Sequence, residues 1–448
     1  MRTLLVNVCR LVLATVFILS GLVKIIDPKG FSYKIEEYAG VFGITEFNVL
    51  HASLFIAAAV AMVEFSVGIY LFFGIRRRST AGVATLMMMA FTVLTFYTWR
   101  WHAVSDCGCF GDVIHLTAEQ TFVKNILLLT CCIPVALWPR RQVRFISEKS
   151  QWTIGLYSWI YGAALCAYNA YTLPVMDFRP YHIGTDILAD MKPETGEGKI
   201  RYVHTFLMEK DGQRKEFSLE DYPDSTWTFV DRRTKIEGDA DALPKIHDLL
   251  ITTPETGVDT TEALLREDGW KFLIVAPNLR DADDGVMDAL AEITDYCKQH
   301  SYPLFCLTSS GDKDIEYWQD VTGAEYRYLI CDETVLKTMI RANPGLVVLK
   351  GSVIKAKFPT SQLPTENDLT DKADRLTLLN PDAASHAHML LSLLLWFVVP
   401  LFVFTLLDNT YQLYINIKRK KSYEKTHCSR QLENEQEPAG GCGPRQGA

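Results

Sequence analysis

The chain has 448 residues, of which 48% are hydrophobic and 22% charged, and its formal net charge is -8 at pH 7. A soluble enzyme seldom reaches this hydrophobic content and a pure membrane bundle carries fewer charges, so the average combines two compositions. The negative balance offers no basic field for nucleic acid, which excludes that class of partner. Eleven cysteines in this length are too few for a disulfide scaffold.

Six apolar stretches are long enough to cross a bilayer, because about 20 helical residues span about 30 Å of hydrocarbon. They are roughly 4–26, 50–75, 80–101, 122–138, 152–173 and 389–407. If all six span, the basic clusters fall on one side: Arg2, Arg76–Arg78, Arg140 to Lys149, and Lys418 to Lys425. Lysine and arginine are enriched on the cytoplasmic side. We therefore predict a multi-pass protein of the cell inner membrane with both termini in the cytoplasm.

The polar segment before the last span is predicted to lie outside the cytoplasm, in the periplasm if the cell is Gram-negative. Alternating residues and turn signals predict a β-rich part at 175–242, and strands alternate with helices over 243–365, as in α/β layers. The other predicted parts are a four-helix bundle at 1–140, a fifth transmembrane helix at 150–174, a sixth at 388–408 and a disordered tail at 418–448.

The most specific local pattern is Asp106-Cys107-Gly108-Cys109-Phe110-Gly111-Asp112, in the short loop between the third and fourth spans. A disulfide between Cys107 and Cys109 would close a small, strained ring, and strain makes the bond easier to reduce. On the oxidising side of the membrane such a bond suits thiol–disulfide exchange, so both cysteines are candidate catalytic residues. A static structural bridge and a pair of metal ligands are the alternatives, although structural zinc usually takes four ligands.

Charged side chains inside or beside the spans are further candidates. Glu64 lies near the centre of the second span, where a charged carboxylate costs roughly 2–3 kcal/mol or more and is normally functional or paired. It is a candidate proton relay, a candidate partner of Arg10 in a buried ion pair, or a group that helps to hold a small redox carrier such as a quinone. Lys124 begins the fourth span, where it either anchors the helix at the interface or lowers a thiol pKa in the cysteine loop. Asp106 and Asp112 are the other supporting residues of that loop.

Several of these residues also form the pattern of a known family. They are Arg10, the run from Phe17 to Pro28, Glu64 followed by Gly68 and Gly74, and the loop from Cys107 to Gly111. Through them the region 1–140 resembles the DoxX-like membrane proteins, in the branch that includes the methylamine-utilisation protein MauE. The resemblance implies a four-helix integral membrane bundle with a role in the maturation of periplasmic proteins through disulfide formation.

The outward α/β segment resembles a thioredoxin-like domain. Asp332-Glu333-Thr334 leads into a helix, and Ala342-Asn343-Pro344-Gly345 then precedes a hairpin strand, where thioredoxins hold a cis-proline. Thioredoxins also place Cys-x-x-Cys after the first central strand, whereas this chain has Pro277 to Ala282 there, without a cysteine. We therefore expect a degenerate module that binds a peptide or a partner protein, with Pro344 at its docking edge.

The leading hypothesis is a membrane redox or maturation protein, in which the Cys107–Cys109 pair exchanges disulfides or electrons with an extracytoplasmic protein client. The alternative is a non-enzymatic assembly module, anchored in the lipid by the bundle and binding its partner through the thioredoxin-like domain. A small-molecule transporter using Glu64 and Arg10 is disfavoured, because four or five helices without inverted repeats or broken segments are unusual for that class. The client and the electron acceptor are not identified by these patterns.

Overall fold

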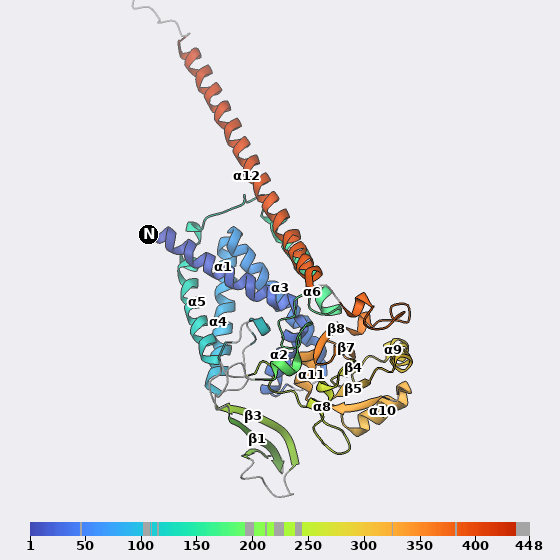
Figure 1. Cartoon of the computed structure of the whole chain (residues 1–448). Helices are drawn as coiled ribbons and strands as arrows, with labels where there is room; N and C mark the ends of the chain where they lie inside the picture. Colours follow the sequence, from blue (N-terminus) through green and yellow to red (C-terminus); the bar gives the residue numbers. More distant parts are fainter. Residues whose placement is uncertain are drawn as a thin grey trace, which may run out of the picture. The chain divides into compact units, whose positions relative to one another are not determined.

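The computed structural model describes residues 1–44, 47–101, 108, 110–113, 116–192, 201–210, 213–218, 228–237, 244–324, 326–380 and 383–435. The chain divides into two compact units (Figure 1). Unit 1 contains Met1–Ala170 and Ala384–Ala448, and unit 2 contains Tyr171–Ala383. Unit 2 is therefore inserted into the sequence of unit 1.

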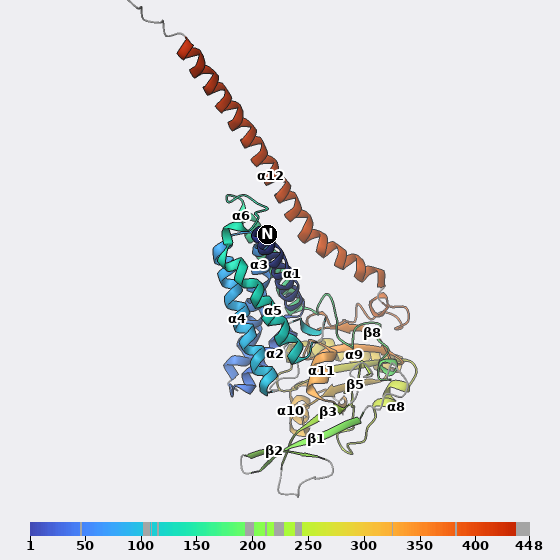
Figure 2. The ribbon, with the colours of Figure 1, turned by 90° about the vertical axis from the view of Figure 1, so that its left-hand side faces the viewer.

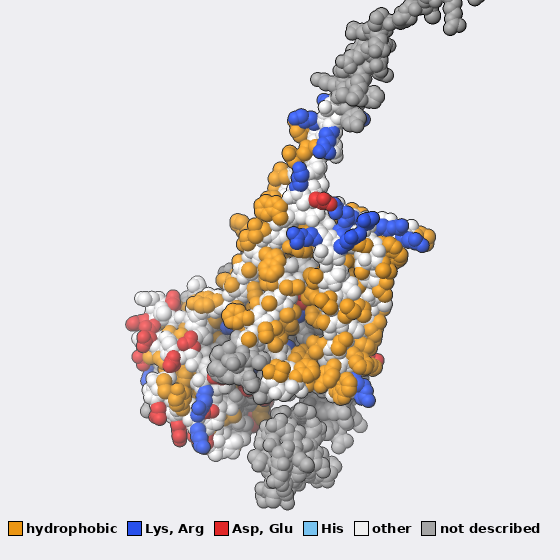
Figure 3. Space-filling model, turned by 180° about the vertical axis from the view of Figure 1, so that it is seen from behind, with side chains coloured by type: hydrophobic (Ala, Val, Ile, Leu, Met, Phe, Trp, Pro, Cys, Tyr) orange, Lys and Arg blue, Asp and Glu red, His pale blue; other side chains and the backbone are white. Residues whose placement is uncertain are grey.

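Unit 1 is helical. Its helices are α1 (Arg2–Ile26), α2 (Pro28–Val41), α3 (Phe47–Phe73), α4 (Arg77–Trp101), α5 (Ala118–Leu137), α6 (Gln151–Tyr171) and α12 (Ala383–Glu435), with short 3-10 turns η1 (Gly111–Val113) and η2 (Pro139–Arg141). Within the described residues, five helices are long and apolar enough to cross a membrane: α1, α3 from Ala52, α4, α5, and α12 over His388–Ser422. Figure 3 shows the apolar side chains that cover this helical surface.

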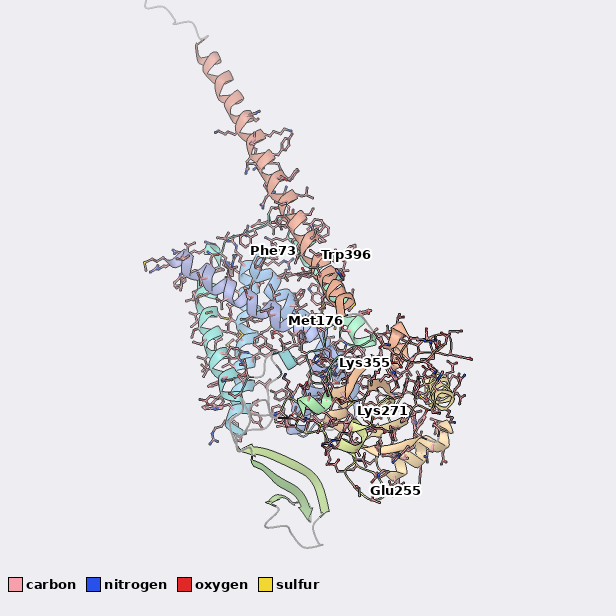
Figure 4. All side chains as sticks on the ribbon, in the orientation of Figure 1. Phe73, Met176, Glu255, Lys271, Lys355 and Trp396 are labelled. Atoms are coloured by element: carbon pink, nitrogen blue, oxygen red, sulfur yellow. The ribbon has the colours of Figure 1, made fainter. Side chains whose placement is uncertain are left out.

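Helix α6 is not one of these five, but it runs beside α12 in the opposite direction. The contacts are Tyr161 Oη to Leu393 O at 2.8 Å, Tyr157 Oη to Trp396 O, and the Ser147 and Ser150 hydroxyls to Asp408 Oδ1 at 2.7 Å each. Trp396 is labelled in Figure 4. Helix α6 and the segment before it therefore run alongside α12 between Leu393 and Asp408, and a membrane crossing by α6 stays a prediction.

The bundle has two distinct ends. One end carries a cluster of arginines, and we call it the basic end. Arg76 lies in the turn after α3, Arg77 and Arg78 start α4, and Arg140, Arg141 and Arg144 follow α5. Helix α1 starts there, since the Asn7 side chain accepts a hydrogen bond from Val143 N at 2.9 Å. It finishes at the opposite end, where α2 follows it, and we call this the α2 end. Figure 3 shows lysine and arginine side chains gathered at one limit of the apolar surface.

Helices α1 and α3 pack closely because glycines line their contact. A Cβ atom built on Gly21 would lie 2.5 Å from Phe65 N, and one built on Gly68 would lie 2.6 Å from Ile18 N. Real Cβ atoms do not approach backbone so closely, so neither position accepts a side chain without movement of a helix. Small residues are a usual way for membrane helices to bring their backbones together.

We predict that Gly21→Ala destabilises the bundle by about 1–3 kcal/mol, because the new methyl group overlaps the α3 backbone. Gly82→Ala in α4 is the matched control, since a Cβ there meets nothing within 4 Å. The control should be neutral or slightly stabilising, as alanine is the better helix former by about 1 kcal/mol. Thermal unfolding of the purified protein in detergent measures both, and equal midpoints for the two variants would contradict the close contact.

Unit 2 contains two sheets (Figures 1 and 2). The first is antiparallel in the order β2-β1-β3, and its strands are β1 (Arg201–Lys210), β2 (Gln213–Ser218) and β3 (Thr228–Glu237). The second has the order β6-β5-β4-β7-β8, and its strands are β4 (Trp270–Ala276), β5 (Leu304–Thr308), β6 (Arg327–Ile330), β7 (Gly345–Lys350) and β8 (Val353–Phe358). β4, β5 and β6 are parallel, whereas β7 is antiparallel to both β4 and β8.

The five-stranded sheet is buried on both faces, because successive residues of a strand point to opposite sides. On one side Phe272 and Ile274 pack against α9 (Met287–His300) and α10 (Asp312–Thr322). On the other side Leu273 and Val275 pack against α8 (Thr261–Arg266) and α11 (Glu333–Met339), while the short α7 (Ile187–Asp190) adds Ile187. Lys271 of β4, labelled in Figure 4, donates from Nζ to Gly351 O at 3.1 Å. The helices on the two faces and the sheet between them form a three-layer α/β arrangement.

The six long apolar stretches coincide with α1, α3, α4, α5, α6 and α12, and β1 to β3 lie within the predicted β-rich part. Two segments differ from the expectation. Residues 28–41 form α2, where no helix is expected, and α12 continues to Glu435, where the tail from 418 is expected to be disordered. The tail segment is rich in lysine, arginine, glutamate and glutamine, which are good helix formers and extend a helix that is already nucleated.

A buried charge network holds the start of unit 2. The Asp177 carboxylate accepts hydrogen bonds from Arg179 Nε at 2.6 Å and from Lys357 Nζ at 2.9 Å. The side chains of Arg179 and Lys357 are 2% and 1% exposed. Burial by itself raises the pKa of Asp177, but the two cations hold it well below its ordinary value of 3.8. Burial lowers the pKa of Lys357 to about 8 in spite of the attraction of Asp177.

This network should make unit 2 sensitive to acid. The contribution of Asp177 is complete above its ordinary pKa of 3.8 and is lost as the pH falls through its lower folded value. Asp177→Asn should cost about 3–5 kcal/mol at pH 7, because two buried cations lose their counter-charge. Urea unfolding of the full chain, followed by tryptophan fluorescence from pH 7 down to pH 2, tests this. Asp371→Asn, on an exposed carboxylate, is the control, and similar stability in the two variants would contradict the expectation.

Candidate functional site

The helices of unit 1 surround a cavity of about 210 Å³ at the α2 end. Each helix contributes residues from one face, at the spacing of three or four that places side chains one above another. The lining residues include Val16, Ser20 and Lys24 of α1, Phe31, Ile35 and Tyr38 of α2, Ile56, Val60 and Glu64 of α3, Met88, Phe91 and Thr95 of α4, and Lys124, Asn125 and Leu128 of α5. The walls are mainly apolar, and the polar side chains are concentrated on α1, α3 and α5.

Lys24 and Glu64 form a buried ion pair in this cavity. The Lys24 Nζ atom lies 3.0 Å from Glu64 Oε2, and each side chain is 5% exposed. Lys24 Nζ also donates to Ser20 Oγ at 2.7 Å and lies 5.2 Å from the centre of the Phe31 ring. Taking both charges out of water is costly, so the pair is stable only while each group keeps its partner.

The pairing of Glu64 differs from the expected one. Arg10 is almost fully buried, but about 21 Å of helix axis separates it from Lys24. At the basic end its guanidinium donates to Val143 O and lies 5.3 Å from the Phe145 ring centre. Arg10 therefore fixes the segment after α5, and Lys24 is the cation next to Glu64. The sequence signal for Lys24 is its position one turn after Ser20 on the inward face of α1.

Helix α2 closes one side of the cavity. Asp27 Oδ1 accepts a hydrogen bond from Gly30 N at 2.8 Å, and Pro28 occupies the first helical turn, so both residues start this helix. Phe31, Ile35 and Tyr38 then follow at intervals of four and three and line the cavity. That interval is the signal by which an amphipathic helix could have been predicted here.

The described residues of the cysteine loop pack against α1 and α2 beside the cavity. A Cβ atom on Gly108 would lie 3.1 Å from Lys34 Cγ of α2, and one on Gly111 would lie 3.0 Å from Val23 Cγ1 of α1. Phe110 lines the cavity, and the Lys124 ammonium lies 4.4 Å from the centre of its ring. The residue that precedes Phe110 in the chain is Cys109.

The thiols themselves are not placed. Asp106, Cys107 and Cys109 lie outside the described residues, as does the side chain of Asp112, whose backbone belongs to η1. Lys124 and Glu64 are brought to one cavity, and Arg10 is not. Within the described part of the chain, no group of three or more histidine, cysteine, aspartate or glutamate side chains is arranged to hold a metal ion.

Pro344 lies in unit 2, directly before β7. Its peptide bond with Asn343 is cis. The Asn343 side chain donates to Asn278 O at 2.7 Å, and Asn343 O accepts from Asp283 N at 3.1 Å, so this segment is bonded to the loop that follows β4. Cys297, Cys306 and Cys331 are buried elsewhere in the unit, and burial raises the pKa of each thiol to about 12.

We predict that Lys24→Met destabilises unit 1 by about 3–5 kcal/mol, since it leaves the Glu64 carboxylate buried without its cation. The double variant Lys24→Met/Glu64→Met should recover much of that loss, because it removes both charges. Thermal unfolding in detergent gives the coupling between the two sites. Glu148→Gln, which breaks an exposed pair with Arg144, is the control and should change stability by less than about 1 kcal/mol. Additive losses in the double variant would show that the two groups do not stabilise each other.

Two family models match parts of the chain. A family model described as methylamine utilisation protein MauE matches residues 2–139, which include α1 to α5 and every residue that lines the cavity. A second family model, a domain of unknown function (DUF8463), matches residues 202–237, which include most of β1 to β3. No curated protein and no solved structure matches the chain. The apolar helices and the family match together identify a multi-pass membrane protein whose N-terminal region is similar to MauE.

Proposed function

We propose that this protein is a membrane-bound thiol–disulfide exchange factor for the maturation of extracytoplasmic proteins, with Cys107 and Cys109 as the exchanging pair. The similarity of residues 2–139 to MauE suggests a membrane-associated maturation role. The observation that carries the redox part of the proposal is the place of the cysteine loop. Gly108 packs on α2, and Phe110 lines a cavity that contains buried charges. These contacts favour a loop that belongs to a polar site over one that only connects two helices.

In a single exchange, atoms and electrons balance between the client dithiol and the Cys107–Cys109 disulfide. One thiolate of a client dithiol attacks a sulfur of the Cys107–Cys109 disulfide and displaces the other sulfur as a thiolate. The second client thiolate then resolves the mixed disulfide, so the client gains one S–S bond and the pair keeps two electrons and two protons. The Lys124 ammonium lies over the ring of Phe110, the residue after Cys109, and this supports the proposal that Lys124 favours the thiolate form.

Unit 2 is the proposed client-binding part. The parallel β4–β5 pair, the antiparallel β7–β8 hairpin and the cis bond before Pro344 support a thioredoxin-like fold. The loop after β4, Pro277 to Ala282, contains no cysteine, and the described thiols of this unit are buried with raised pKa values. These features favour recognition of a protein chain over dithiol chemistry in unit 2.

The basic end of the bundle supports the orientation that this function requires. Lysine and arginine are enriched on the cytoplasmic side of membrane proteins, so the α2 end and the cysteine loop are proposed to face outward. The last turn of α6 is also at the α2 end, because the Asn169 side chain donates to Ile25 O at 3.2 Å. The chain therefore leaves unit 1 for unit 2 on the side of the proposed exchange site.

Thiol trapping in intact membranes tests the proposal. We expect Cys107 and Cys109 to cycle between dithiol and disulfide, with a midpoint potential within the range of catalytic pairs, about -120 to -270 mV. Cys107→Ser and Cys109→Ser should each abolish transfer of disulfides to a reduced client, while the protein still inserts into the membrane. A pair that stays oxidised under strong reductant would instead favour an anchored binding module.

The matched control is Cys166→Ser in α6, because that thiol is buried and lies on a helix that does not line the cavity. It should leave both the trapping pattern of the loop and the transfer activity unchanged. Normal client maturation in cells that carry the double serine variant would end the redox proposal.

A further inference from the structure

Each turnover of the proposed exchange leaves Cys107 and Cys109 reduced, so the pair needs a two-electron acceptor. We propose that the cavity at the α2 end binds the ring of a lipid-soluble quinone, which accepts those electrons. The donor in this step rests on the proposed function, whereas the binding site rests on the cavity and its charges alone. Four features of the cavity support this ligand: its size, its polar groups, its access and its distance along the chain from Cys109.

The size of the cavity suits one substituted ring. Its volume is about 210 Å³, and most of its walls are apolar side chains such as Phe17, Phe91 and Leu128. Benzene binds an engineered apolar cavity of about 150 Å³, so a ring with a few substituents fits this larger space. A long acyl or isoprenoid chain does not fit in addition, and it would have to extend out of the cavity.

The polar groups suit an acceptor that gains negative charge. Among the described residues, two ammonium groups, Lys24 and Lys124, and one carboxylate, Glu64, line the cavity, so the described lining carries a formal charge of plus one. The Asn125 amide is 2% exposed, and its nitrogen lies 3.2 Å from Thr95 Oγ1. Quinone oxygens accept hydrogen bonds, and they become more negative on reduction, so a site with an excess ammonium stabilises the reduced ring.

Access from the bilayer is provided on the α3 side. Ile56 lines the cavity, yet its side chain is 45% exposed, and it belongs to the apolar part of α3 that begins at Ala52. An exposed lining residue on a helix that is long and apolar enough to span supports an opening of the cavity toward the hydrocarbon. An apolar ligand whose tail stays in the membrane uses such an opening.

The electron donor is adjacent in sequence. Phe110 lines the cavity and is covalently joined to Cys109. In the balanced step, the two S–H bonds of the pair break, one S–S bond forms between Cys107 and Cys109, and two electrons and two protons pass to the quinone oxygens. The product is a quinol, which returns to the membrane. Glu64, ion-paired with Lys24 inside the cavity, is positioned to pass one of these protons.

Binding of a short-chain benzoquinone, with a decyl tail, to the full chain in lipid nanodiscs tests the site. The titration uses the Cys107→Ser/Cys109→Ser variant, so that no electron transfer contributes to the signal. Val60→Trp fills the cavity and keeps both charged residues of the ion pair, and Val63→Trp is the matched control, because Val63 is on the same helix but does not line the cavity. Ile35→Trp blocks the same cavity from α2 if Val60→Trp does not fold.

We expect the serine variant to bind the quinone, Val60→Trp or Ile35→Trp to weaken binding about tenfold or more, and Val63→Trp to leave it unchanged. Equal affinities for the cavity and control variants, or no saturable binding to any of them, would overturn the inference. The two proposals fail separately. If the cavity binds quinone but the cysteine pair of the wild-type protein never cycles, only the redox function is rejected. If the pair cycles but the chain binds no quinone, only this binding site is rejected.

Discussion

The buried ion pair between Lys24 and Glu64 constrains how α1 and α3 pack in unit 1, because neither charge can be left without the other. The pair forms only if α1 and α3 are close, and the absence of side chains at Gly21 and Gly68 permits that approach. A buried cation and a buried carboxylate are each unfavourable alone, so the pair favours the one register of α1 against α3 that brings them together. The same register places Ser20 and Val60 on the cavity wall, and it leaves room for α2 to cover the site.

Much of the fold was predictable, because the periodicities are strong. The long apolar stretches predict the long helices of unit 1, and the nearly continuous apolar runs of β4 and β5 predict a sheet buried on both faces. Helix α2 was missed because it is short and only one of its faces is apolar, so it resembles a polar loop when composition is averaged. The helical extension of α12 beyond Lys418 was missed for a related reason: charge content indicates exposure, and an exposed segment can still be helical.

The candidate site was only partly predictable. A carboxylate inside an apolar stretch, such as Glu64, is easily recognised in a sequence. Whether Arg10 or Lys24 is its partner depends on which end of α1 lies beside Glu64 of α3. That choice is set by the crossing of α1 and α3, which glycine spacing indicates but does not fix. The cavity itself has no local signal, because its lining is distributed over five helices and a loop, with only a few residues on each.

The connectivity of the chain links the two units through the same end of the bundle. Helix α6 starts after the basic end and finishes beside Ile25, and α12 returns antiparallel to it. An insertion between two antiparallel helices leaves and re-enters a membrane on one side, so unit 2 and the loop between α4 and α5 share that side whenever α4, α5, α6 and α12 all span. The proposed function needs this shared side, because it assigns client recognition to unit 2 and disulfide exchange to the cysteine pair. The α6–α12 pairing through Asp408, Tyr157 and Tyr161 is therefore as important for the proposed function as the cavity, although it contributes no reacting group.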